Sequence, residues 1–222
     1  MSRIGGVVAL VGATAAELVW QVVTPVVEGT PAADQVAAAA AHPGRMQVSV
    51  WLDLLLLLAI PSALYIGAVA GGRSSRLATV GASLAFVTAL GAGYILATDL
   101  MVAEVARGGG GPEQAAAIDA FQFGTISTVL LVAYLAGHLV GYVLLAVALF
   151  RARAIPTWAA AALGLAPIVQ IAGDAAGIGA VSTVADALAL VGAVACALVW
   201  ARRTASDDGI LPATRTSVTA TS

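Results

Sequence analysis

The chain has no lysine, one cysteine and two histidines, and only 10% of its 222 residues are charged. Soluble domains carry about a quarter charged residues, so this scarcity excludes an ordinary soluble domain. The net charge of −2, without any run of basic residues, argues against a nucleic-acid partner, because binding phosphates needs a clustered basic patch. The lone Cys196 lies in an apolar segment, cannot form an internal disulfide and has no companions for a metal or redox motif.

The sequence also lacks the motifs of the common intramembrane enzymes. It has no Gly-x-Ser-Gly serine motif, no His-Glu-x-x-His motif and no Gly-x-Gly-Asp motif of the intramembrane aspartyl proteases. Only His138 lies in an apolar run, while His42 falls in a loop, so haem ligation by two histidines is not expected. We therefore expect no catalytic residue and no cofactor, leave a bound metal undecided, and regard an enzyme as the least favoured class.

Long apolar runs are what the sequence has in abundance. A helix needs about 20 apolar residues to cross the hydrocarbon core of a membrane, and its backbone must satisfy its own hydrogen bonds there. The runs predict an all-α, polytopic six-helix bundle over 1–203, with a disordered cytoplasmic tail over 204–222 and spans at about 4–27, 47–71, 77–103, 122–150, 157–178 and 181–201. Loop 28–46 predicts a short surface helix ended by Pro43-Gly44, and Pro61 and Pro167 are expected to interrupt spans 2 and 5.

The arginines predict the orientation of these spans. Arg45 and Arg107 fall on one side of the predicted membrane, and the other eight fall on the opposite side: Arg3, Arg73, Arg76, Arg151, Arg153, Arg202, Arg203 and Arg215. By the positive-inside rule both termini are cytoplasmic. The Ala-, Gly- and Arg-rich composition suits a high-GC bacterium, so the expected location is a bacterial inner membrane. Cleavage of a signal peptide after "ATA" at 13–15 is the alternative, but the apolar run continues well beyond it.

The carboxylates have the opposite bias: all except Asp207 and Asp208 in the tail fall in or beyond the outer half of the predicted membrane. Glu17, Asp53 and Asp186 lie roughly two turns or fewer below the outer surface, and Asp99 and Asp174 lie nearer the rim. Four carboxylates have a polar residue four positions away, on the same helix face. The pairs are Glu17 with Gln21, Ser49 with Asp53, Gln170 with Asp174, and Ser182 with Asp186. A carboxylate facing lipid costs several kcal/mol, so these side chains are expected to face the bundle interior. For Asp53, Asp119 and Asp186, helix capping is an equal alternative.

The fourth span carries a second polar cluster. Tyr134, His138 and Tyr142 share one face, and Gly137 with Gly141 forms a G-x-x-x-G that lets another helix approach closely. His138 is a candidate proton relay; the structural alternative is a histidine hydrogen-bonded to a tyrosine or a carbonyl at a tight crossing.

One segment also resembles a known family. The stretch "GHLVGYVLLAVALFRARAIPTWAAAAL", 137–163, looks like part of the six-helix membrane proteins of unknown function that are common in actinobacteria. The matching features are His138, Gly141, "ALFRAR", Pro156 and Trp158. The resemblance implies the six-helix architecture and no particular activity.

These observations lead to one functional hypothesis and one alternative. We expect the chain to bind or pass a cation or proton through an outward-facing vestibule lined by Glu17, Gln21, Asp53, Asp99, Asp174 and Asp186, with a proton relay at His138, Tyr134 and Tyr142. The alternative is an accessory subunit whose small-residue helix faces bind other membrane proteins. The expected partners are the lipid bilayer and either a second copy or another membrane protein.

Overall fold

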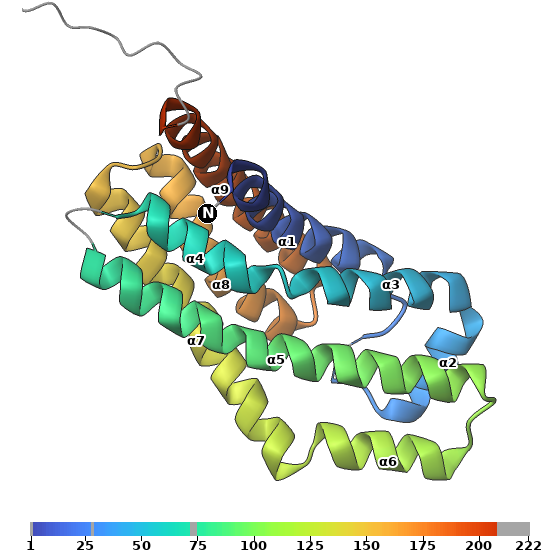
Figure 1. Cartoon of the computed structure of the whole chain (residues 1–222). Helices are drawn as coiled ribbons and strands as arrows, with labels where there is room; N and C mark the ends of the chain where they lie inside the picture. Colours follow the sequence, from blue (N-terminus) through green and yellow to red (C-terminus); the bar gives the residue numbers. More distant parts are fainter. Residues whose placement is uncertain (1, 28, 72–74, 208–222) are drawn as a thin grey trace, which may run out of the picture.

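All regular secondary structure in the described residues, 2–27, 29–71 and 75–207, is helical (Figure 1). The structure is a computed structural model, and in these ranges six spans are long and apolar enough to cross a membrane, as the sequence predicts. The helices are α1 (Arg3–Val23), α2 (Ala32–Ala41), α3 (Pro43–Leu56), α4 (Ala59–Val69), α5 (Ser75–Arg107), α6 (Pro112–Gln122), α7 (Thr125–Ala152), α8 (Thr157–Ala176) and α9 (Gly179–Asp207).

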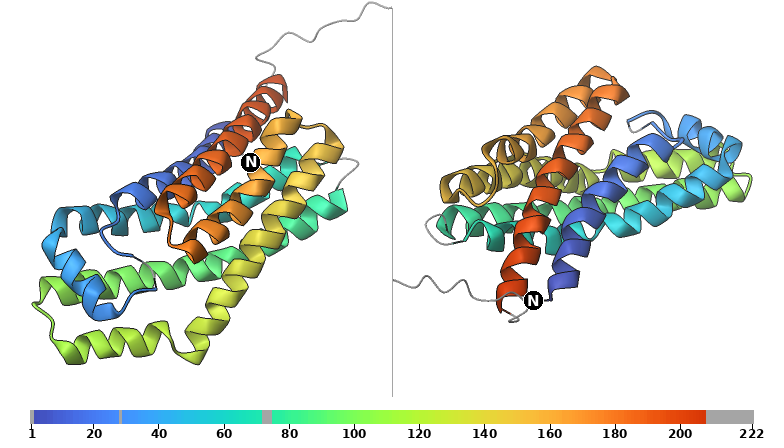
Figure 2. Two further views of the ribbon diagram at one scale, coloured as in Figure 1. Left: turned by 180° about the vertical axis from the view of Figure 1, so that it is seen from behind. Right: turned by 90° about the horizontal axis from the view of Figure 1, so that it is seen from above.

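The spans form a closed ring in the order of the chain. α1 packs against the span made of α3 and α4, that span packs against α5, α5 against α7, α7 against α8, and α8 against α9, which returns to α1 (Figure 2). α4 also contacts α7 and α9 across the ring. A core of buried apolar side chains fills the interior of this ring, including Leu10, Ile66, Val69, Leu145 and Leu163.

The two prolines act differently. Pro61 has no N–H to offer the carbonyl of Leu57, which instead accepts from the amide of Ile60 at 3.2 Å. The second span therefore divides into α3 and α4 just before Pro61, as predicted. The expected interruption at Pro167 is wrong, because α8 runs through this buried proline as one helix.

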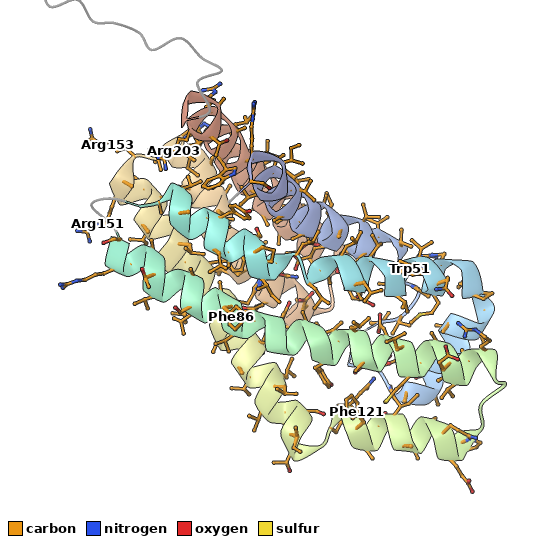
Figure 3. The ribbon with its side chains drawn as sticks, in the orientation of Figure 1. Trp51, Phe86, Phe121, Arg151, Arg153 and Arg203 are labelled. Carbon is orange, nitrogen blue, oxygen red and sulfur yellow. The ribbon has the colours of Figure 1, made fainter. Side chains whose placement is uncertain are left out.

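The two ends of the bundle differ in charge and in construction. One end, which we call the arginine end, carries Arg3, Arg76, Arg151, Arg153, Arg202 and Arg203; Figure 3 shows three of them together. The other, the cap end, carries Arg45 and Arg107 together with α2 and α6 (Figure 1). Arg73, Arg215 and most of the predicted tail lie outside the described residues, while 204–207 belong to α9.

α2 and α6 form a helical cap with an apolar core of its own. This second cluster includes Ala32, Met46, Val50, Val102 and Ile118. The predicted surface helix is confirmed as α2, but Pro43 begins α3 rather than only ending α2. α6 was missed, although a proline at its first position and an alanine-rich run are helix signals.

Specific polar contacts hold the cap together. Asp119 Oδ1 accepts from the amide of Ala32 at 2.9 Å, so this carboxylate caps α2 from the middle of α6 and does not cap its own helix. Gln122 Nε2 donates to Gln35 Oε1 at 3.0 Å, and the Tyr94 hydroxyl donates to the Gln122 carbonyl at 3.2 Å. These bonds join α2, α5 and α6.

Replacing Asp119 with alanine is expected to loosen α2 selectively. The first amide of α2 loses its acceptor, and losing such a cap costs about 1 kcal/mol. Hydrogen exchange should show faster exchange in α2 and little change in α8. Glu113→Ala removes an exposed carboxylate from the same helix, α6, and is the matched control. Equal exchange in both variants would contradict the capping role.

The G-x-x-x-G of α7 lies at its crossing with α5. A Cβ on Gly137 would stand 2.5 Å from the carbonyl oxygen of Leu84, and one on Gly141 would stand 2.6 Å from the backbone nitrogen of Ala85. The predicted close approach is therefore made within the chain itself.

Candidate functional site

A chain of hydrogen bonds crosses three helices through Glu17, Gln170 and His138. His138 Nε2 on α7 lies 3.0 Å from Gln170 Oε1 on α8, and Gln170 Nε2 donates to Glu17 Oε1 on α1 at 3.4 Å. An amide oxygen only accepts, so His138 Nε2 must be the donor and carries a proton. The amide thereby orients Glu17 and fixes the imidazole.

Two tyrosines flank this histidine. The Tyr134 and His138 rings are stacked with centroids 5.5 Å apart, and the His138 and Tyr142 rings are tilted with centroids 5.1 Å apart. Tyr142 is also within electrostatic range of Glu17. The three residues predicted as a relay therefore lie together, near Glu17 of α1. The partner of His138 is Gln170 rather than the tyrosine or carbonyl of the structural alternative.

Asp186 on α9 lies in the same region and is 2% exposed. Its Oδ2 has no hydrogen-bond partner among the described residues. Glu17 and Asp174 are both within electrostatic range of Asp186, and Asp174 accepts a hydrogen bond from the Ser182 hydroxyl. We call these residues the Glu17 group: Glu17, His138, Gln170, Asp174, Ser182 and Asp186. The described arginines lie at the two ends of the bundle, so none of them neutralises this group.

Asp53 and Asp99 form a second group, which we call the aspartate pair. The Asp99 carboxyl on α5 interacts with the side chains of Asp53 on α3 and Trp20 on α1. Asp53 is 1% exposed and Asp99 is 4% exposed. Ser49, one turn from Asp53 on α3, is fully buried, and its hydroxyl has no hydrogen-bond partner in the part of the chain that the structure describes.

The two groups are neighbours across α1. Glu17 and Trp20 are three residues apart on this helix and therefore lie on adjacent positions of one face. Glu17 contacts α8 and Trp20 contacts the aspartate pair between α3 and α5. The predicted set of six is thus divided into two groups, and Gln21, which is half-buried, belongs to neither.

One sequence expectation about these carboxylates needs correction. Asp99 was placed at the entrance, but it is buried, whereas Asp174 is exposed as expected. The polar neighbours one turn away on the same helix are not the hydrogen-bond partners of Glu17 and Asp186. Glu17 bonds Gln170 on another helix, and Ser182 donates to Asp174 instead of Asp186.

Sequence reasoning missed where Gln170 and Trp20 lie relative to these carboxylates. Gln170 was noted only as a same-face neighbour of Asp174 on its own helix, yet it bridges α7 and α1. Trp20 received no role, although its position three residues after Glu17 places it on the polar face of α1. Periodicity identifies a shared face but does not say which helix lies opposite.

No group of three or more His, Cys, Asp or Glu side chains in the described ranges is arranged to hold a metal ion. Comparison with protein-family models, curated proteins and solved structures finds no match to this chain. The resemblance to the actinobacterial six-helix proteins therefore rests on segment 137–163 alone.

Proposed function

We propose that this chain is a multi-pass protein of a bacterial inner membrane, with both termini in the cytoplasm and the cap end on the opposite side. The six apolar spans and the concentration of arginines at one end support this orientation. It places the Glu17 group in the half of the bundle nearer the outer surface.

The Glu17 group binds a proton or a small cation that enters from the outer side. The observation that carries this proposal is Asp186, a buried carboxyl with an unpartnered oxygen and two further carboxylates nearby. A buried ionised carboxylate is very costly unless a positive charge or hydrogen-bond donors compensate it. A bound proton or cation supplies the charge that the surrounding side chains do not provide.

Asp174 and His138 give the group an entrance and an inner end. Asp174 is exposed beside the turn between α8 and α9, whereas Asp186 is buried. His138 is linked to Glu17 through Gln170, and its Nδ1 has no hydrogen-bond partner among the described residues. Since Nε2 is the donor to Gln170, Nδ1 is the nitrogen that accepts a proton arriving at the inner end.

The accessory-subunit alternative has no specific support among the described contacts. Its basis was the small-residue helix faces, and the G-x-x-x-G of α7 is occupied by α5 of the same chain. It remains as an outcome of the functional test.

The test is the thermal stability of the full chain in lipid nanodiscs, measured over a pH series and with Na⁺, K⁺, Mg²⁺ and Ca²⁺. A ligand that binds only the folded state stabilises it by about 2.7 kcal/mol at 100 times its Kd. We expect the melting temperature to rise with added protons or with one of the cations, and Glu17→Gln and Asp186→Asn each to remove that rise.

Asp34→Asn is the matched control, because Asp34 is an exposed carboxylate on α2. It should retain the full response of the parent. Flat curves for the parent, with Glu17→Gln and Asp186→Asn behaving like it, would overturn the proposal and favour the accessory-subunit alternative.

A further inference from the structure

We infer that the arginine end carries a binding pocket for the phosphate group of an anionic membrane phospholipid, with Arg151 and Arg153 as the residues that hold it. A pocket of about 320 Å³ lies at this end, lined by Gly71, Arg151, Ala152 and Arg153. Small-molecule sites have volumes of about 300–1,000 Å³, so it is large enough for a lipid headgroup. The inference does not rest on the proposed function, because it uses no residue of the Glu17 group.

Two turns that lie far apart in the sequence form this pocket. Gly71 follows the end of α4, and Arg151 and Arg153 stand at the end of α7, which α4 contacts. Arg203 on α9 lies beside the first turn, because its Nη1 donates to the Val69 carbonyl at 3.0 Å. Figure 3 shows Arg151, Arg153 and Arg203 at the same end of the bundle.

The turn that carries Arg153 has a defined backbone conformation. Arg153 has a φ of 51° and is the one non-glycine residue of the described ranges with a positive φ. Glycine is the usual residue at this position after a helix. The amide of Ala154 donates to the Leu149 carbonyl at 3.1 Å, and Ile155 is buried in the core. The chain therefore keeps an arginine where the backbone favours glycine, and such strained positions concentrate at functional sites.

The guanidinium groups of Arg151 and Arg153 are available to an anion. Both residues are exposed, and neither forms an ion pair or a hydrogen bond through its side chain within the described ranges. No aspartate or glutamate whose side chain the structure describes lies at the arginine end. A simpler role would be to bond the last carbonyls of a helix, as Arg203 does for α4. The side chains of Arg151 and Arg153 make no such bond to the described residues.

The chemistry of the pocket and its level in the bundle favour a phospholipid. The planar guanidinium presents a fork of N–H donors that matches the oxygens of a phosphate group. Phe150 and Trp158, which precede and follow the two arginines in the chain, are 55% and 65% exposed. Exposed tryptophan is typical of the headgroup level of a membrane, and basic pockets between spans at that level bind anionic headgroups.

Native mass spectrometry of the full chain in detergent tests the inference, with phosphatidylglycerol and phosphatidylcholine of the same acyl chains as probes. We expect the parent to bind phosphatidylglycerol more tightly than phosphatidylcholine. Arg151→Gln and Arg153→Gly should each weaken the binding of phosphatidylglycerol about fivefold, which is the contribution of one basic side chain near a membrane surface.

Arg3→Gln is the matched control, because Arg3 is exposed at the same end and is not among the residues that line the pocket. It should bind phosphatidylglycerol like the parent. Glu17→Gln and Asp186→Asn should do the same, so failure of the proposed function and failure of this inference are distinguishable. Glycine suits the left-handed conformation of position 153, so Arg153→Gly should fold and melt no lower than the parent.

Equal binding of the two lipids by the parent would overturn the inference, as would unchanged binding of phosphatidylglycerol by both Arg151→Gln and Arg153→Gly. A loss in Arg3→Gln as large as in these variants would overturn it too, because the general charge of this end would then suffice. Glycerophosphoglycerol offers the same phosphate without acyl chains. Its binding as tightly as the intact lipid would identify a free phosphate compound as the ligand and overturn the assignment to a lipid.

Discussion

Replacing Gly141 with leucine is expected to prevent the stable packing of α5 against α7. A Cβ at this position would lie 2.6 Å from a backbone nitrogen of α5, and a backbone atom cannot move aside as the end of a flexible side chain can. Overpacking a core costs about 1–3 kcal/mol, and more where backbone is displaced. Because α5 and α7 form the most extensive helix contact in the bundle, we expect a loss of at least about 3 kcal/mol, at the upper end of that range.

The measurement is the yield of monodisperse protein and its melting temperature in detergent. Gly93→Leu is the matched control, since Gly93 lies on α5 and a Cβ there would meet nothing within 4 Å. This control should purify and melt like the parent. If Gly141→Leu behaved in the same way, the crossing of α5 and α7 would be wrong.

Replacing Asp186 with asparagine is expected to stabilise the protein in alkaline, cation-free solution. In the parent the carboxylate is then ionised in a buried place, near Glu17 and Asp174, without the positive charge that it needs. Asparagine has nearly the same shape and no charge. We expect a gain of about 1–3 kcal/mol, which corresponds to roughly 2–4 °C in melting temperature for each kcal/mol.

The same substitution should remove the stabilisation by protons or cations. The melting temperature without ligand is then expected to rise, while the increase caused by added protons or cations is lost. Such a trade-off is typical of a residue kept for function. Asp34→Asn, on an exposed carboxylate, should change neither quantity. A lower melting temperature for Asp186→Asn at every pH would show instead that the carboxylate is a structural hydrogen-bond acceptor.

Hydropathy was sufficient to predict the six spans, and proline chemistry was sufficient to predict the division of the second span before Pro61. Both depend on local properties of the chain. α6 escaped detection because it is too short and too polar to resemble a span. It is held by contacts with α2 and α5, including the bond from Tyr94, which are not visible in a single sequence.

The candidate site could be predicted only in part. Asp186 is buried and Glu17 is half-buried, in line with the cost of exposing charge to lipid. The partners of these residues depend on which helices are neighbours in the ring. Gln170 reaches Glu17 because α1 and α8 both pack against α9, and Asp99 lies near Asp53 because α5 packs against α3.

The central claim is that the buried carboxyls of the folded chain hold a compensating positive charge. Its most direct test is to unfold the purified protein in weakly buffered solution at neutral pH and to measure released protons with a pH indicator and released cations by elemental analysis. We predict release of protons, cations or both by the parent, and less release by Asp186→Asn and by Glu17→Gln. Unfolding without release of either, or equal release by the parent and both variants, would contradict the account.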